Sequence, residues 1–127
     1  MSRFAKSWLV SWGVFYGVGA PLFQWLYVRK NGFINQFTFA DLVLGLIMLI
    51  SVVLIRRPIG RLLNAVAWGG FLAVFSSALT YFHFFLKADT PVEALYVTGL
   101  GLFVAVTCLA VHLTGNGTFE PLDGGRP

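Results

Sequence analysis

The sequence predicts an all-α integral membrane protein built as a bundle of four transmembrane helices. Its composition is the first indication, because 57% of the 127 residues are hydrophobic and only 11% are charged, whereas soluble domains carry about 25% charged residues. The apolar residues also gather into four long runs separated by short polar segments. This length leaves room for one domain and for no separate soluble catalytic unit.

The first run, 7–28, follows Arg3 and Lys6 and so shares the basic start and apolar middle of a signal peptide. Pro21 comes directly after the small residues at 18–20 that would have to serve as the cleavage site, and the apolar run continues beyond it. We therefore expect a retained helix. A kink near Pro21 is expected too, because proline removes a backbone donor and clashes with the preceding turn.

The other three runs are also long enough to be spans. The second, 39–55, stops at two arginines and would reach roughly 25 Å as a helix, which is short but adequate. The third, 62–86, can cross at a tilt, and the fourth, 91–113, is followed by Gly-Asn-Gly. We thus expect one transmembrane domain over 1–114 and a short polar tail over 115–127.

Aromatic residues are concentrated in the first and third runs, while the second and fourth are mostly aliphatic. The same order of an aromatic and an aliphatic run therefore occurs twice along the chain. This pattern is consistent with two helical hairpins that arose by duplication.

The distribution of charge predicts the orientation. Six of the nine Lys and Arg residues fall in the N-terminal segment, the second loop and the tail, so the positive-inside rule predicts a multi-pass protein with cytoplasmic N- and C-termini. The net charge of +4 does not indicate nucleic acid, because the basic residues form small groups between apolar runs. One such group, Arg56, Arg57 and Arg61, is a candidate for contact with anionic lipid headgroups.

Small residues recur every four positions in the third run, at Ala65, Gly69, Ala73 and Ser77. This spacing places them on one helix face, where small side chains let another helix approach closely. Similar faces contain Gly101 and Ala105 in the fourth run, and Gly13, Gly17 and Ala20 in the first. Packing within the monomer is the explanation we favour, and contact with a second copy or another membrane subunit is the alternative.

Two carboxylates lie near predicted spans, Asp41 and Glu93, each three residues after a threonine. Thr90 and Glu93 form a capping box with proline between them, and Thr38 and Asp41 form a weaker version of it. We expect both carboxylates to cap helix starts. No acidic residue lies near the middle of a span, which argues against a proton-coupled exchanger.

A histidine in a membrane helix can ligate a haem iron. His83 and His112 lie at predicted helix ends on opposite sides of the membrane, so they cannot share one haem. His83, which has aromatic neighbours, is the candidate for a single-ligand cofactor site, although an interfacial histidine in an aromatic belt is the interpretation we favour. The lone cysteine, Cys108, is expected to be a buried structural thiol, and no cofactor is required by the sequence.

Four polar residues in the spans have two interpretations each. Gln24 would hydrogen-bond across a helix interface, and Ser76, Ser77 and Thr80 would bond to carbonyls of their own helix. The alternative is that Gln24, Ser76 and Thr80, together with Ser77, line a polar pathway. Asn64 is expected at the membrane interface.

No catalytic triad, metal-binding spacing or phosphate-binding glycine loop is present in the sequence. We therefore favour a non-catalytic accessory or scaffold subunit that acts through helix contacts in a membrane complex. The first alternative is a small homo-oligomeric transporter or channel. The second is a redox or pigment-associated subunit with His83 as its axial ligand.

Overall fold

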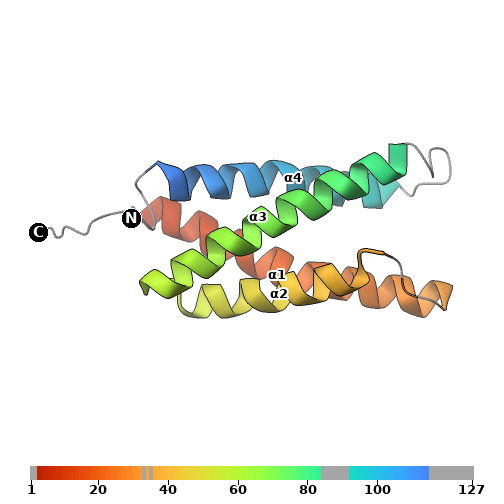
Figure 1. The fold of residues 1–127 in the computed structure, drawn as a ribbon, viewed down its shortest axis with the longest axis horizontal. Coiled ribbons are helices and arrows are strands. Elements are labelled where there is room, and N and C mark those ends of the chain that lie inside the picture. The colour runs from red at the N-terminus through yellow and green to blue at the C-terminus, as the bar shows by residue number, and fades with distance from the viewer. Residues whose placement is uncertain (1–2, 33, 35, 84–91, 115–127) are drawn as a thin grey trace, which may run out of the picture.

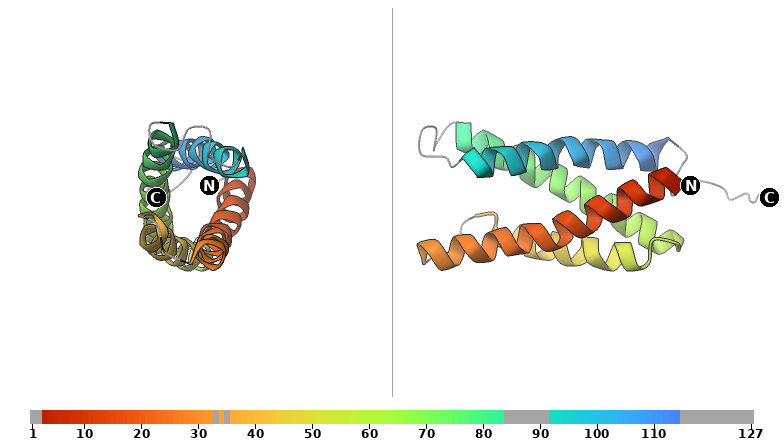
Figure 2. Two further views of the ribbon diagram at one scale, coloured as in Figure 1. Left: turned by 90° about the vertical axis from the view of Figure 1, so that its right-hand side faces the viewer. Right: turned by 180° about the vertical axis from the view of Figure 1, so that it is seen from behind.

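The computed structural model describes residues 3–32, 34, 36–83 and 92–114. They form four α-helices, α1 (Arg3–Asn31), α2 (Thr38–Val53), α3 (Pro58–Tyr81) and α4 (Val92–Leu113), and no strand occurs in these ranges. The helices follow one another around the bundle in chain order (Figures 1 and 2). An all-α architecture of four helices is confirmed, with bounds that differ by a few residues from the predicted runs. The predicted tail, 115–127, lies outside the described residues.

Local signals account for two of the helix ends. After α1, Gly32 adopts a left-handed φ of 79°, and its amide donates to the Val28 carbonyl at 2.7 Å. Glycine adopts this conformation without the steric penalty of a Cβ atom. α3 begins with Pro58 after the extended residue Arg57, because proline has a suitable φ and no amide to leave unpaired in the first turn.

The connection from α2 to α3 is a tight turn. The Arg57 amide donates to the Leu54 carbonyl at 2.8 Å, and the Arg61 guanidinium donates to the Arg56 carbonyl at 3.0 Å. Gly60 is buried beside this turn, where a Cβ atom would collide with the Leu54 carbonyl. Glycine at position 60 is therefore what allows α3 to start so close to the end of α2.

Glycines also bring α1 and α2 together. α1 continues through Pro21, which has no amide to donate to the Gly17 carbonyl four residues earlier. That carbonyl oxygen lies 2.9 Å from the point where a Cβ of Gly45 would stand, and the ring of Pro21 lies 2.5 Å from the same point. Gly45 thus leaves room for the proline and for the carbonyl that the proline leaves without its helical partner.

The centre of the bundle is aromatic. The ring centroids of Tyr16 and Phe75 are 5.5 Å apart, and those of Phe71 and Phe75 are 5.2 Å apart. Trp68 lies beside Tyr16, with ring centroids 6.1 Å apart, and it is fully buried. Cys108 is also buried in this core, as expected for a structural thiol.

α1 and α4 meet near the start of α1 and separate toward its end, as the view from behind shows (Figure 2). Two hydrogen bonds join them, from the Trp8 indole to the Thr107 hydroxyl at 2.9 Å and from the Tyr16 hydroxyl to the Val97 carbonyl at 3.0 Å. The bundle is therefore closed at the end where α1 begins and wider at the other.

Among the described residues, two helices, α3 and α4, are long and apolar enough to cross a membrane. α2 is apolar but has 16 residues. The 29-residue α1 does not meet the same criterion, because its many tryptophan, tyrosine and glycine residues lower its hydropathy. By length and composition, the four predicted spans are therefore supported for two helices and not for the other two.

Candidate functional site

A cluster of buried polar side chains joins α1 to the first turn of α2. The Gln24 amide donates to Asp41 Oδ2 at 2.7 Å, and its carbonyl oxygen accepts from the Thr38 hydroxyl at 2.9 Å. All three side chains are more than nine-tenths buried. The hydrogen bond across a helix interface that the sequence predicted for Gln24 is confirmed.

The capping role predicted for Asp41 is wrong. Phe37, and not Thr38, occupies the N-cap position of α2, and it makes no side-chain capping hydrogen bond. Thr38 and Asp41 both bond to Gln24 instead. The antiparallel hairpin brings Gln24, near the end of α1, level with the start of α2, where these two side chains satisfy its buried amide.

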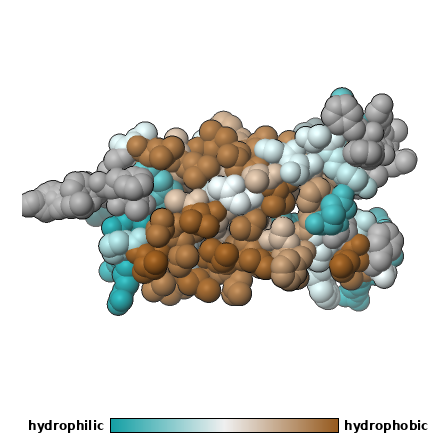
Figure 3. Space-filling view, in the orientation of Figure 1, coloured by the Kyte–Doolittle hydropathy of each residue, from teal (hydrophilic) through white to brown (hydrophobic). Residues whose placement is uncertain are grey.

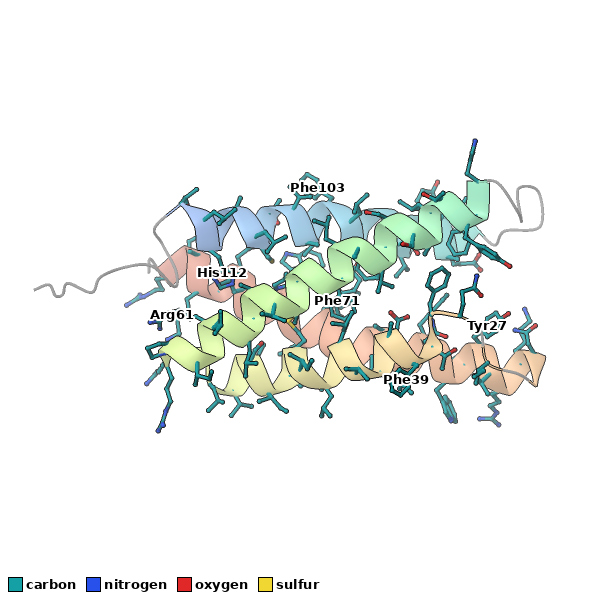
Figure 4. All side chains as sticks on the ribbon, viewed as in Figure 1. Tyr27, Phe39, Arg61, Phe71, Phe103 and His112 are labelled. Atoms are coloured by element: carbon teal, nitrogen blue, oxygen red, sulfur yellow. The ribbon has the colours of Figure 1, made fainter. Side chains whose placement is uncertain are left out.

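A cavity of about 440 Å³ lies next to this cluster. All four helices contribute to its wall, including Tyr16 and Gln24 from α1, Asp41 from α2, Phe75 from α3 and Val97 from α4. It occupies the wider half of the bundle, toward the end at which Figure 4 labels Tyr27. One oxygen of Asp41, Oδ1, is buried there and has no hydrogen-bond partner among the described residues.

A second buried polar cluster joins α2, α3 and α4 near the opposite end, where Figure 4 labels His112. His112 Nε2 lies 2.8 Å from Asn64 Oδ1, and because a carbonyl oxygen accepts, the imidazole donates this bond. Asn64 Nδ2 donates to the Ser51 hydroxyl at 3.0 Å, which donates to the Met48 carbonyl at 2.6 Å. The three polar side chains have 1% or less of their surface exposed.

The side chain of Asn64, expected at the membrane interface, is fully buried between helices and does not reach the outer surface of the bundle. A weak signal for this cluster is present in the sequence. Ser51, Asn64 and His112 each interrupt an apolar stretch, and polar residues within apolar helices commonly bond to one another across helix contacts. Pairing these interruptions across adjacent helices would have found the cluster.

The other residues of the predicted polar pathway do not join Gln24. Ser76 and Thr80 lie on the exposed side of α3, where their hydroxyls donate to the Leu72 carbonyl at 2.7 Å and the Ser76 carbonyl at 2.9 Å. Ser77 is exposed as well. Ser76 and Thr80 thus match the interpretation in which each hydroxyl bonds to a carbonyl of its own helix, and neither of them lines the cavity beside Gln24.

His83, the candidate cofactor ligand, is exposed at the end of α3 and does not line the cavity. The residues that follow it, 84–91, lie outside the described part of the chain. Within the described ranges, no group of three His, Cys, Asp or Glu side chains is arranged to hold a metal ion. His112 is committed to Asn64 in the second polar cluster.

The small-residue face of α3 does not pack inside the monomer. Ala73 and Ser77 are exposed, and a Cβ added at Gly69 would meet no atom within 4 Å; Ala65 is partly exposed. The buried side of α3 carries its large residues instead, so packing within the monomer is wrong for this face. The matching face of α4 is buried, with Gly101 against the ring of Phe75 and Ala105 in the core.

The three arginines predicted to contact lipid headgroups differ in their surroundings. Arg56 and Arg57 are exposed at the α2–α3 turn and remain candidates for headgroup contact. Arg61 is partly buried and donates to backbone carbonyls of that turn, so its contacts are structural. Thr90 and Pro91 of the second predicted capping box lie outside the described residues, and Glu93 is exposed in the first turn of α4.

Comparisons with protein-family models, curated proteins and solved structures found no match. The residues and their geometry are therefore the basis for a functional proposal.

Proposed function

We propose that this chain is an integral membrane protein whose four helices all lie in the bilayer, and that it acts through helix contacts as a non-catalytic accessory or scaffold subunit. The observation that carries the first part is the apolar outer surface of α1 and α2. Large apolar side chains that do not line the cavity are exposed along both helices, among them Val14, Val18, Leu46 and Val53. The mean hydropathy of a helix does not depend on which face its apolar side chains occupy, so it does not detect an apolar outer face.

The outer surface of the bundle supports this placement. Figure 3 shows an apolar band across the middle of the molecule, with hydrophilic residues gathered toward its two ends. Monomeric soluble proteins rarely expose contiguous apolar patches of more than a few hundred Å². A band that continues over several helices is what contact with lipid acyl chains requires.

The basic residues support an orientation. The start of α1 and the α2–α3 turn lie at the same end of the bundle (Figure 1), and this end carries Arg3, Lys6, Arg56 and Arg57. Arg29 and Lys30 lie in the last turn of α1, at the other end. By the positive-inside rule, the N-terminus and the α2–α3 turn face the cytoplasm.

The small-residue face of α3, formed by Ala65, Gly69, Ala73 and Ser77, supports the scaffold role. α3 exposes three large apolar side chains, whereas α4 exposes eight, and a paler strip over α3 crosses the apolar band in Figure 3. Small exposed residues leave lipid chains little to pack against but let another helix approach closely. We propose that this face contacts a helix of another membrane subunit.

Site-specific photocrosslinking tests the contact. A benzophenone maleimide attached to Ala73→Cys in native membranes is expected to give a discrete protein adduct, because position 73 faces the partner helix. Phe103→Cys, exposed on the lipid-facing side of α4, is the matched control and is expected to give none. The native Cys108 is buried and adds little background. Equal adduct formation at both positions, or none at position 73, would count against the scaffold role.

A further inference from the structure

The cavity beside Gln24 and Asp41 has a single formal charge. Among the described residues that line it, Asp41 is the one side chain that is charged at neutral pH, and no lysine or arginine belongs to the wall. Asp41 is 6% exposed, and its Oδ2 is satisfied by Gln24. Its Oδ1 is buried and has no hydrogen-bond partner in the described ranges of the chain. A buried carboxylate oxygen in this state is costly unless a donor or a cation meets it.

Aromatic rings make up much of the rest of the wall. Phe15, Tyr16, Phe75 and Tyr81 contribute to it together with further aromatic residues, and small and aliphatic side chains complete the lining. Aromatic faces carry partial negative charge and attract organic cations, most strongly where water is excluded. A wall of aromatic rings around one carboxylate therefore favours a positive group that is attached to an apolar body.

The shape of the bundle makes room for such a ligand. α1 and α4 separate toward this end (Figure 2), and the volume of about 440 Å³ falls in the usual range for small-molecule sites, about 300–1,000 Å³. A metal ion is a poor fit, because a hard cation requires several oxygen ligands and the cavity offers one free carboxylate oxygen. An anion would meet the negative charge of Asp41.

We propose that this cavity binds an organic cation with an apolar body, a protonated lipophilic amine or a quaternary ammonium, with Asp41 Oδ1 as its counter-ion. Gln24 and Thr38 act as positioning residues, since Gln24 donates to Oδ2 and thereby fixes Oδ1 toward the cavity, while the Thr38 hydroxyl donates to the Gln24 carbonyl oxygen and holds that amide in place. The site is independent of the scaffold role, because the small-residue face of α3 takes no part in it.

Equilibrium dialysis of the full-length protein in an uncharged maltoside detergent tests the site, with radiolabelled tetraphenylphosphonium as the probe. We expect saturable binding at one site per chain. Asp41→Asn keeps the size and can still accept from Gln24, and it is expected to weaken binding at least tenfold. Triphenylphosphine oxide, an uncharged compound with similar rings, is expected not to compete.

A second variant blocks the cavity without altering the carboxylate. Gly19 lines the cavity, and a Cβ at this position meets no atom within 4 Å, so Gly19→Leu is expected to fold and to weaken binding at least tenfold. Gly99→Leu is the control, since Gly99 is equally open but does not line the cavity. Its binding is expected to stay within twofold of the wild type.

Competition distinguishes two sources of the cation. Lysophosphatidylcholine carries a quaternary ammonium and lysophosphatidylglycerol does not, although their tails are the same. Displacement of the probe by the choline lipid alone would support a lipid headgroup as the ligand, and displacement by neither would support a dissolved cation. Non-saturable binding, equal binding by the Asp41→Asn variant, or competition by the phosphine oxide would overturn the proposal.

Discussion

Gly60→Ala is expected to destabilise the protein more than any other single-methyl addition in the described helices. The new Cβ would occupy the position of the Leu54 carbonyl, which is backbone and has no rotamer into which it can move. Overpacking a well-packed site lowers the free energy of unfolding by about 1–3 kcal/mol, and a clash with the backbone is expected to give a loss at the upper end of this range. We expect the thermal unfolding midpoint in detergent, followed by circular dichroism, to fall sharply.

Gly69→Ala is the matched control for this prediction. It adds the same methyl group to the same helix at a position where no atom lies within 4 Å. Alanine replaces glycine in a helix with a gain of up to about 1 kcal/mol, so its midpoint is expected to stay or rise. If both variants melt alike, the tight α2–α3 turn is not as we describe it.

Asn64→Leu is expected to give the second largest loss of stability. The change removes the acceptor of His112 and the donor to Ser51, and both partners are fully buried. A buried polar group left unsatisfied costs about 1–3 kcal/mol. We expect a loss of about 2 kcal/mol in the free energy of unfolding, measured by titration with a denaturing detergent.

The double variant Asn64→Leu/His112→Leu tests the cause of that loss. Replacing both partners with apolar groups leaves no imidazole without an acceptor, so part of the stability should return. Ser76→Ala, which removes an exposed hydroxyl bonded to its own helix, should change little. A double variant that is less stable than either single one would mean that the polar cluster is not the source of the effect.

The four helices could be predicted because each apolar run carries its own signal. The ends of the runs were marked by Arg56, Arg57 and Pro58 and by glycines, and the observed bounds lie within a few residues of them. The aromatic core was not predicted, because an aromatic residue in an apolar run can face either lipid or another helix. Tyr16 and Phe15 are adjacent, yet Tyr16 is buried and Phe15 is exposed.

The candidate site was largely missed, for a reason that Asp41 illustrates. A carboxylate in the first turn of a helix has a local explanation as a cap, and the sequence shows no sign that a distant amide competes for it. For its partner, Gln24, the sequence predicts a hydrogen bond across a helix interface but not the residue that shares it. The two residues meet because α1 and α2 form an antiparallel hairpin in which positions 24 and 41 are side by side. This alignment depends on where α1 ends and on the length and path of the connection to α2.

The small-residue face of α3 was identified correctly as a set of residues, but its environment was not. Spacing determines which residues share a helix face. It does not determine which way the face points, because α3 has two faces that could pack, one with small residues and one with Trp68, Phe71 and Phe75. The aromatic face is the buried one, since it contributes far more apolar surface to the core.

The central claim, that all four helices lie in the bilayer, is tested most directly by cysteine labelling from the two sides of the membrane. Three exposed positions are each replaced by cysteine: Arg3→Cys, Lys30→Cys and Arg57→Cys. Position 3 lies at the start of α1, position 30 at its end, and position 57 after the end of α2. With a membrane-impermeant maleimide on intact cells, we predict labelling at position 30 and, at positions 3 and 57, labelling only after permeabilisation. Reaction of positions 30 and 57 from the same side would contradict the account, because α2 would then not cross the membrane.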